Sequence, residues 1–309
     1  MRFIVVNLTP DLNNISLDPW DLNTFRENEL QATVCRLDKI HPEISGNKWF
    51  KLKYYLERAR KENKQKLISF GGAYSNHLIA LAAAADMNGY SSTGMIRGEE
   101  PIRLSHTLLA AKNYGMELRF LSRMAYNRKK NSVQSVEEEA TDPDALLIPE
   151  GGAGAEGVRG AEEILSGIPA GGYTHICCAA GTGTMLAGLI NSAGPDQKII
   201  GVSVLKGTRD FEPLNRAWIK NQAYLQRVEM IHEYHFGGYA KPAKSLIDFM
   251  NRTYQESGIP TDFVYTGKLL FAIAGMAASH AFPAGSRILV LHSGGLQGNL
   301  SLPPGLLQF

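Results

Sequence analysis

A lysine at a predicted helix start is the first residue whose surroundings suggest chemistry. The segment Ser45-Gly46-Asn47-Lys48 leads into a predicted helix over 49–60, whose apolar face carries Leu52, Tyr55, Leu56 and Ala59. Lys48 would therefore stand at the junction of a loop and a helix. A single lysine in such a place is usually a solvated surface residue. Its role depends on the segments that follow.

Two glycine-rich turns each follow an apolar run and precede a predicted helix. The first, over 69–77, contains Gly71, Gly72, Ser75, Asn76 and His77, and the second, over 179–185, contains Gly181, Thr182, Gly183 and Thr184. Glycines let the backbone approach a ligand, and free N–H groups at a helix start suit a carboxylate or phosphate. Ser75 could equally be an ordinary N-cap. The second turn lacks both the full dinucleotide fingerprint and the P-loop lysine.

Two further segments place hydroxyl residues beside glycine at the ends of elements. They are Val264-Tyr265-Thr266-Gly267-Lys268 and His292-Ser293-Gly294-Gly295, the second of which ends the apolar run 288–291. Each of them, taken alone, fits a structural turn as well as a binding site.

The composition excludes several classes of function. The 309 residues exceed one compact domain, and the net charge of +2 with scattered basic residues predicts no nucleic-acid partner. No run of about 18 apolar residues suggests a membrane span, and residues 1–9 lack the features of a signal peptide. Cys35, Cys177 and Cys178 are expected to be reduced core residues, with no metal site, which predicts a cytoplasmic protein.

Short β-like runs alternate with Ala- and Leu-rich helical stretches. The first series has runs at 66–70, 93–97 and 118–121 with helices at 77–86 and 104–114, and the second has runs at 146–149, 175–180, 199–204 and 287–292. This alternation predicts parallel sheets covered by helices. The polar segment 127–143 lies between the two series, and its triplet Glu137–Glu139 predicts an exposed helix.

Together, and in this order, the five segments resemble the 1-aminocyclopropane-1-carboxylate (ACC) deaminase and D-cysteine desulfhydrase family of fold-type-II pyridoxal-phosphate (PLP) enzymes. The resemblance spans 36–295, and Gly46-Asn47-Lys48 followed by Gly71-Gly72 and Ser75-Asn76 is its most specific part. It implies the α/β fold of the tryptophan synthase β-subunit, with two open, twisted, mostly parallel sheets flanked by helices. Residues 1–48 and 146–309 would form the larger PLP-binding domain and 49–145 a smaller inserted domain. Such enzymes are commonly homodimers.

The resemblance also implies how the cofactor is held. Lys48 would bind PLP as a Schiff base and move the proton at the α- or β-carbon of the substrate. Lys51 would keep Lys48 neutral through its like charge. Asn76 would contact the 3′-hydroxyl and Ser293 the pyridine nitrogen. The phosphate would lie against Gly181, Thr182, Gly183 and Thr184.

On the substrate side, the resemblance implies that Ser75, with the backbone N–H groups of Asn76 and His77, binds the carboxylate of a small amino acid. Tyr265 would stand over the reacting carbon as an acid/base group, with Thr266 beside it. Less bulky residues are common in the family at the positions of Trp49, Phe50 and Tyr74, so these aromatic side chains are expected to narrow or reshape the pocket.

Two positions favour a desulfhydrase over an ACC deaminase. Deaminases that open the cyclopropane ring typically have Glu after the tyrosine and Leu in the His-x-Gly-Gly motif, where this chain has Thr266 and Ser293, and His77 also fits the desulfhydrase pattern. We therefore expect a lyase that converts D-cysteine to pyruvate, ammonia and sulfide by β-elimination. The alternatives are an ACC deaminase, which is a hydrolase giving 2-oxobutyrate and ammonia, a racemase of the same fold, and a non-catalytic amino-acid sensor.

Overall fold

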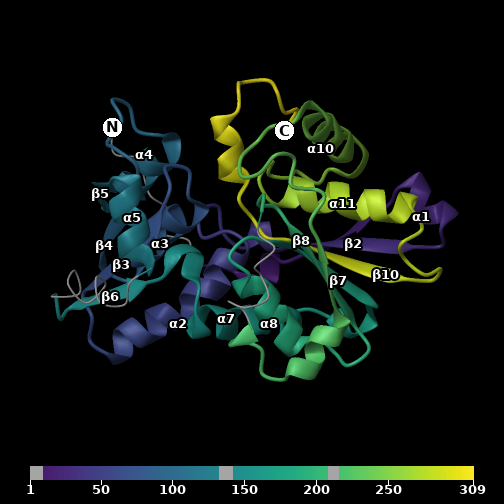
Figure 1. The fold of residues 1–309 in the computed structure, drawn as a ribbon, viewed down its shortest axis with the longest axis horizontal. Coiled ribbons are helices and arrows are strands. Elements are labelled where there is room, and N and C mark those ends of the chain that lie inside the picture. The colour runs from purple at the N-terminus through teal and green to yellow at the C-terminus, as the bar shows by residue number, and fades with distance from the viewer. Residues whose placement is uncertain (1–9, 132–141, 208–215) are drawn as a thin grey trace.

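Two sheets organise the chain, as Figure 1 shows for the computed structural model, which describes residues 10–131, 142–207 and 216–309. The larger sheet has the strand order β1-β2-β10-β7-β8-β9, and the smaller one the order β5-β4-β3-β6. Within the described residues β1 is antiparallel to β2, and every other strand pair is parallel. The prediction of two mostly parallel sheets flanked by helices is confirmed.

The larger sheet is buried on both faces at its centre. Every residue of β7 is buried, which is typical of a parallel strand covered on both sides. Because side chains alternate along a strand, Cys177 and Cys178 belong to hydrophobic clusters on opposite faces of this sheet. These two cysteines and Cys35 are buried and free, as expected. The strands of this sheet are β1 (Leu17–Trp20), β2 (Gln31–Arg36), β7 (His175–Ala180), β8 (Lys198–Ser203), β9 (Val228–Ile231) and β10 (Arg287–His292).

Helices cover the two faces of the larger sheet (Figure 1). One face packs against α7 (Ala155–Ser166) and α8 (Thr184–Ser192), and the other against α11 (Thr266–Ala278) and α1 (Asn23–Glu27). Helix α10 (Lys244–Ser257) packs on α11. Short 3-10 turns complete this part of the chain at Leu12–Asn14, Leu37–Ile40, Glu150–Gly152, Ala170–Gly172, Gln222–Arg227 and Leu296–Ser301.

The smaller sheet lies between α3 and α5. Helix α3 (Asn76–Met87) packs against β3 and β4 through a buried alanine-rich face, and α4 (His106–Asn113) packs on α3. Helix α5 (Arg123–Asn131) packs against β4 and β5 on the other side, where Tyr126 meets Phe70 edge to face. The strands are β3 (Lys66–Gly71), β4 (Ser91–Arg97), β5 (Glu117–Leu121) and β6 (Ala145–Ile148).

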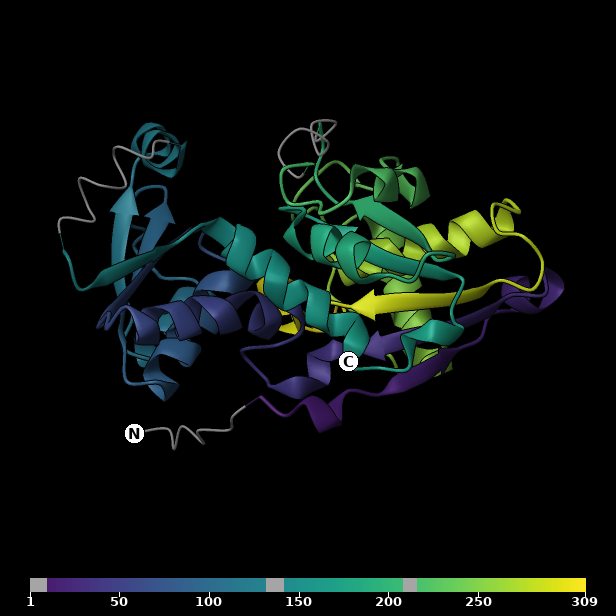
Figure 2. The same ribbon diagram turned by 90° about the horizontal axis from the view of Figure 1, so that it is seen from below.

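Helix α2 (Asn47–Lys61) connects the two sheets. It packs against α3 on one side and against α7 on the other, and Figure 2 shows α2 and α7 next to each other. The predicted apolar face of this helix, Leu52, Tyr55, Leu56 and Ala59, is buried, as expected. The helix begins at Asn47, two residues before the expected start, so Lys48 lies within its first turn.

Two features differ from the sequence-based expectations. The expected boundary between residues 145 and 146 falls inside β6, and β6 pairs with β3, so the smaller sheet extends to Ile148. An apolar run alone does not reveal which sheet it joins. Helix α5 occupies the start of the polar segment 127–143 because Tyr126 anchors it. The triplet Glu137–Glu139 lies outside the described residues.

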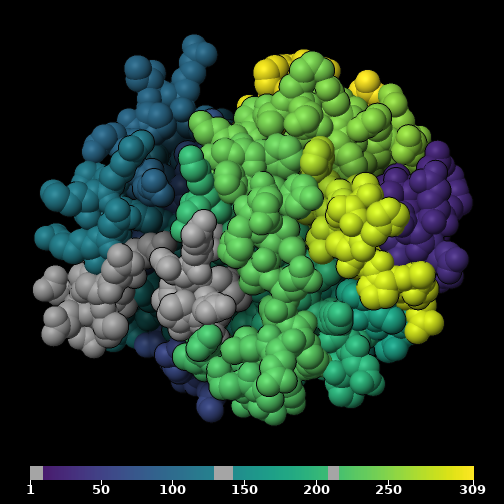
Figure 3. Space-filling model, turned by 45° about the vertical axis from the view of Figure 1, so that its right-hand side comes forward, coloured from purple at the N-terminus to yellow at the C-terminus, as the bar shows by residue number. Residues whose placement is uncertain are grey.

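The chain after β9 forms part of the outer surface. The space-filling view in Figure 3 shows residues after 216, in green, spread over the face that it presents. This segment carries Tyr239, which reaches the cavity described below. Among the described helices none is long and apolar enough to span a membrane.

Candidate active site

A cavity of about 810 Å³ lies where strands of both sheets end. Residues at or just after the carboxyl ends of β3, β4 and β6 line it from the smaller sheet, and residues after β7, β8 and β10 line it from the larger sheet. Ligands of open parallel α/β sheets bind at such carboxyl ends. Of the positions expected in the site, ten line this cavity: Lys48, Lys51, Ser75, Asn76, His77, Gly181, Thr182, Gly183, Tyr265 and Ser293.

Lys48 projects into the cavity from the first turn of α2. Its Nζ donates a hydrogen bond of 2.6 Å to Oδ1 of Asn47, a buried side chain whose Nδ2 in turn lies 3.4 Å from Sδ of Met185. Burial lowers the pKa of Lys48 to about 8, against the opposing attraction of the Asp262 carboxylate. About a tenth of this amine is therefore uncharged at pH 7, far more than for an ordinary lysine, and can attack a carbonyl carbon.

The loop before Lys48 is packed against the loop after β10. Gly46 has φ of +62°, and a Cβ at this position would overlap the carbonyl group of Ser293. The N–H of Asn47 donates to that same carbonyl oxygen at 3.2 Å. Glycine at 46 therefore allows the close approach that brings Lys48 and Ser293 to one cavity.

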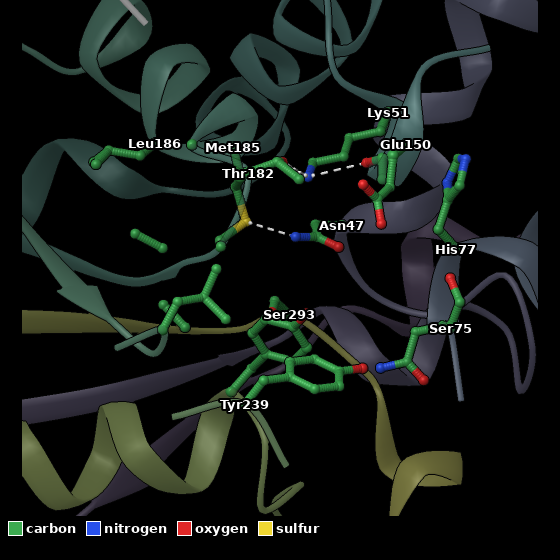
Figure 4. A pocket seen from close by; sticks show the side chains of 18 of the residues that line it. Asn47, Lys51, Ser75, His77, Glu150, Thr182, Met185, Leu186, Tyr239 and Ser293 are labelled. Carbon is green, nitrogen blue, oxygen red and sulfur yellow. Dashed lines mark hydrogen bonds between the residues drawn. The ribbon is translucent and has the colours of Figure 1, made fainter. Parts of the chain in front are cut away.

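Lys51 lies one turn further along α2 and is also buried. Its Nζ is 3.4 Å from both Oγ1 of Thr182 and the carbonyl oxygen of Gly151, and Figure 4 shows it along the same side of the cavity as Thr182. Burial and then the charge of Lys48 hold the pKa of Lys51 well below its usual value. The expected effect therefore runs the other way: the charge of Lys48 lowers the pKa of Lys51, while burial lowers the pKa of Lys48.

The start of α8 forms an anion-binding turn beside Lys51. Gly183 is the N-cap in a left-handed conformation, with φ of +77°, and it has no side chain to occupy the first N–H groups of the helix. These N–H groups and the helix dipole favour a phosphate. Oγ1 of Thr182 and Oγ1 of Thr184 are 3.0 Å apart, but Thr184 is fully buried and lies outside the cavity lining.

The start of α3 contributes three polar residues. Ser75 lines the cavity and is also the N-cap, since its Oγ accepts the N–H of Leu78 at 3.3 Å. Oδ1 of Asn76 accepts a hydrogen bond from the side-chain amide of Gln297, which leaves its Nδ2 as a donor. His77 is buried with Nε2 2.8 Å from Oγ of Ser69.

The start of α11 is held by a buried carboxylate. Asp262 accepts hydrogen bonds from the N–H groups of Val264, Tyr265 and Thr266 at 2.7–2.9 Å. The Tyr265 ring lies over Gly181, where a Cβ would come within 3.2 Å of its Cε1. Burial, then the neighbouring Tyr239 and the carboxylates of Asp262 and Glu150, raise the pKa of Tyr265 well above its usual value. This phenol therefore remains a proton donor.

Besides Thr184, four of the expected positions do not reach the cavity lining. Thr266 lies in the first turn of α11 with its side chain fully buried, so the structure does not bring it to the substrate site. Phe50 packs in the core, Trp49 packs against it, and Tyr74 is exposed beside His106. The three aromatic residues do not narrow the pocket. The two in the first turn of α2 pack in or against the core, and the one before α3 faces solvent.

Sequence reasoning missed several residues that line or support the cavity. Glu150, Arg97 and Tyr239 line it, and Figure 4 shows Glu150 across the cavity from Tyr239. Gln297 supports Asn76. Glu150 and Arg97 each follow or end a predicted strand, which was the available signal. Tyr239 and Gln297 reach the cavity or its neighbours through long-range packing, so no local sequence pattern marks them.

The described residues fit a phosphorylated aldehyde such as PLP. An amine of lowered pKa stands at one part of the cavity, and a helix start with Lys51 and Thr182 stands at another. Ser293 and the Nδ2 of Asn76 supply neutral hydrogen-bonding groups in the same cavity. An amine, an anion site and neutral polar groups are the three features that such a ligand requires.

Comparison with known proteins agrees with this chemistry. A protein of Pyrococcus horikoshii with the provisional name 1-aminocyclopropane-1-carboxylate deaminase is 27% identical and covers 95% of each chain. The D-cysteine desulfhydrase of Salmonella newport is 27% identical over 84% of this chain and 85% of its own. The crystal structure of an ACC deaminase homologue superposes with a TM-score of 0.80 at 26% identity, over 94% of this chain and 92% of the other.

The profile of one enzyme family matches nearly the whole chain. It covers residues 20–294. This range includes every element that lines the cavity and both sheets, except for the first three residues of β1. The chain therefore belongs to the family of pyridoxal-phosphate dependent enzymes, and pyridoxal phosphate is its cofactor.

Proposed function

We propose that this enzyme is a lyase that releases sulfide and ammonia from D-cysteine, with Lys48 as the residue that holds PLP. The observation that carries the proposal is the Lys48 amine, with its pKa lowered to about 8, in the same cavity as the anion-binding start of α8. The overall reaction breaks the Cα–H, Cβ–S and Cα–N bonds and consumes one water, whose oxygen becomes the keto oxygen of pyruvate, with ammonia and sulfide released. Bound PLP supplies the electron sink for loss of the α-proton.

The residues around the cofactor have separate tasks in this proposal. Lys51 and Thr182, with the backbone of Gly181 and Gly183, bind the phosphate, whose charge would restore the proton on Lys51. Nδ2 of Asn76 donates to the ring oxygen. Ser293 contacts the ring nitrogen as a neutral hydroxyl partner.

The substrate-side residues bind and move protons. Ser75 and the backbone N–H groups of Asn76 and His77, at the start of α3, bind the carboxylate. Once Lys48 is released from the cofactor, its amine takes the α-proton. Tyr265 stays protonated and can donate a proton at the leaving group.

A second reaction, ACC deamination, has specific support in the names of similar proteins from Pyrococcus horikoshii and among solved structures. The preference for D-cysteine rests on Ser293 and His77, which both line the cavity, whereas Thr266 lies outside the lining and does not support it. Neither reaction requires a change in the roles of Lys48 or the phosphate site.

One set of incubations separates these activities. Purified protein with PLP is given D-cysteine, L-cysteine, D-serine and ACC, and sulfide, pyruvate and 2-oxobutyrate are assayed. Equal amounts of sulfide and pyruvate from D-cysteine support the proposal. Release of 2-oxobutyrate from ACC, with no sulfide from D-cysteine, would replace it by the deaminase. Exchange of the α-hydrogen without any keto acid would indicate a racemase.

The predicted homodimer is tested by the same preparation. Light scattering coupled to size-exclusion chromatography should give twice the mass of one 33.9 kDa chain. A mass of one chain would contradict this assembly.

A further inference from the structure

The imidazole of His77 has one nitrogen without a partner in the cavity wall. The side chain is 3% exposed and lines the cavity, and Figure 4 shows it at the same end as Ser75 and Glu150. Its Nε2 is bonded to Oγ of Ser69, but its Nδ1 has no hydrogen-bond partner among the described residues. Buried polar nitrogens are nearly always paired, so this one points to a ligand.

The neighbours of His77 favour one tautomer of its ring. Oγ of Ser69 is 2.8 Å from Nε2 and 3.5 Å from the carbonyl oxygen of Pro149. A carbonyl only accepts, so the arrangement that satisfies all three groups has the Ser69 hydroxyl donating to Pro149 and Nε2–H of His77 donating to Oγ of Ser69. In a neutral imidazole this leaves Nδ1 unprotonated, as a hydrogen-bond acceptor.

The imidazole stays neutral in this setting. Burial, followed by the charges of Lys48 and Lys51, lowers the pKa of His77 to about 3. The two lysine amines are directed to other acceptors, Lys48 to Asn47 and Lys51 to Gly151 and Thr182. The ligand therefore has to bring the donor for Nδ1.

Most groups of an amino-acid substrate cannot supply that donor. Its carboxylate is an acceptor, like the phosphate of the cofactor, and its amino group is directed to the cofactor in place of Lys48. A donor on the substrate side chain remains. The cyclopropane ring of ACC carries only C–H bonds, whereas cysteine and serine carry S–H and O–H.

We propose that Nδ1 of His77 accepts a hydrogen bond from a thiol or hydroxyl group on the β-carbon of the amino-acid substrate. This inference rests on the proposed function and narrows its substrate class. It makes the His77 side chain a specificity-determining residue, in addition to the backbone N–H that binds the carboxylate. The same contact would discriminate against substrates whose β-carbon carries no donor.

Two matched variants separate the two nitrogens of the ring. His77→Asn keeps a polar atom near the position of Nδ1, and His77→Gln keeps one near the position of Nε2. The holoenzyme and both variants are titrated with serine and with O-methylserine, whose oxygen has no proton. Binding is followed by the visible spectrum of PLP in stopped flow, before product accumulates. Both enantiomers are used, and the tighter one is compared.

The measured quantity is the preference for serine over O-methylserine. We expect His77→Gln to reduce this preference about fivefold relative to the unaltered enzyme, and His77→Asn to retain most of it, because a typical hydrogen bond changes affinity by about that factor. An unchanged preference in His77→Gln, or an equal loss in both variants, would overturn the inference. If the inference about His77 is overturned but sulfide is still released from D-cysteine, the proposed function is kept without it. If neither serine nor O-methylserine binds and no sulfide is released from D-cysteine, both fail.

A second measurement does not depend on any variant folding. The ¹⁵N shifts of the histidine side chains in the holoenzyme report which ring nitrogen carries hydrogen. We expect His77 to show the Nε2–H form, with an Nδ1 resonance that moves on adding serine and not on adding O-methylserine. An Nδ1–H form would contradict the inference, because that nitrogen would then be a donor.

Discussion

The side-chain amide of Gln297 donates to Oδ1 of Asn76, and its own oxygen accepts from Oγ1 of Thr107 at 2.9 Å. Gln297 thus joins the turn after β10 to the starts of α3 and α4. Gly295 makes room for this contact, because a Cβ there would lie 2.8 Å from Nδ2 of Asn76. The orientation of the Asn76 amide is therefore set by a residue that does not line the cavity.

Replacing Gln297 by Leu should weaken PLP binding without unfolding the protein. Asn76 would lose the contact that keeps its Nδ2 toward the ligand, which corresponds to one hydrogen bond and about a two- to tenfold loss of affinity. A titration of apoprotein with PLP, read by fluorescence quenching, measures this change. Gln255→Leu, at an exposed position on α10, is the control and should bind PLP as before. Equal affinity in the two variants would show that Gln297 does not position Asn76.

Gly46→Ala should damage both stability and the site. The positive φ of Gly46 disfavours alanine, and its new Cβ would overlap the backbone of Ser293. We expect the free energy of unfolding to fall by about 3 kcal/mol, as for an overpacked and strained position. PLP affinity should fall with it, since Lys48 and Ser293 would move apart.

Urea unfolding and PLP titration measure the two effects of this change. Gly171→Ala is the control, because a Cβ at that exposed glycine meets nothing within 4 Å. If Gly46→Ala unfolds at the same urea concentration as Gly171→Ala, the close approach of the two loops is not required.

A buried lysine holds the segment that carries Tyr239. Nζ of Lys268 donates to the carbonyl oxygens of Gly238 at 2.7 Å, His235 at 3.0 Å and Val204 at 3.3 Å, and the side chain has no exposed surface. Lys268→Met would leave three carbonyl groups without this donor. We expect the free energy of unfolding to fall by about 2–4 kcal/mol.

Urea denaturation of Lys268→Met is compared with Lys244→Met on the neighbouring helix α10. Lys244 is exposed and pairs with Asp248 one turn away, so its loss should change stability by no more than about 0.5 kcal/mol. Similar midpoints for the two variants would show that the carbonyl contacts of Lys268 contribute little.

The sequence predicted the residues that line the site better than the residues that hold them in position. The segments at Lys48, Ser75, Gly181 and Ser293 sit at element starts or ends, where glycine and hydroxyl residues are recognisable, and the structure brings them to one cavity. Thr266 follows the same local pattern but turns into the core, because Asp262 starts α11 at that residue. Local sequence does not determine which side of a new helix a residue faces.

Elements with distant partners were the hardest to predict. Strand β2 pairs with β10, whose residues lie about 250 positions later in the chain. Leu146 begins an apolar run that suits either sheet, and only pairing with β3 decides between them. Gln297 and Tyr239 reach the site through such long-range packing, so no periodicity marks them.

The lowered pKa of Lys48 predicts how fast the apoprotein captures PLP at different pH. Only the uncharged amine attacks the aldehyde carbon, and burial brings the pKa to about 8 from an ordinary value of about 10.4. Below pH 8 the ammonium form predominates and the rate should fall with decreasing pH. Above pH 8 the amine is mostly uncharged, so the rate should level off. Stopped-flow measurement of the visible absorbance after mixing apoprotein with PLP gives this profile.

Two variants tie the profile to this lysine. Lys48→Ala should show no covalent capture at any pH, and Lys61→Ala, at the exposed end of α2, should reproduce the profile of the unaltered protein. A rate that continues to rise between pH 8 and pH 10 would mean that burial does not lower the pKa of Lys48. The amine would then need another group to remove its proton, and Lys51, the buried neighbour on the same face of α2, would be the residue to examine by Lys51→Met.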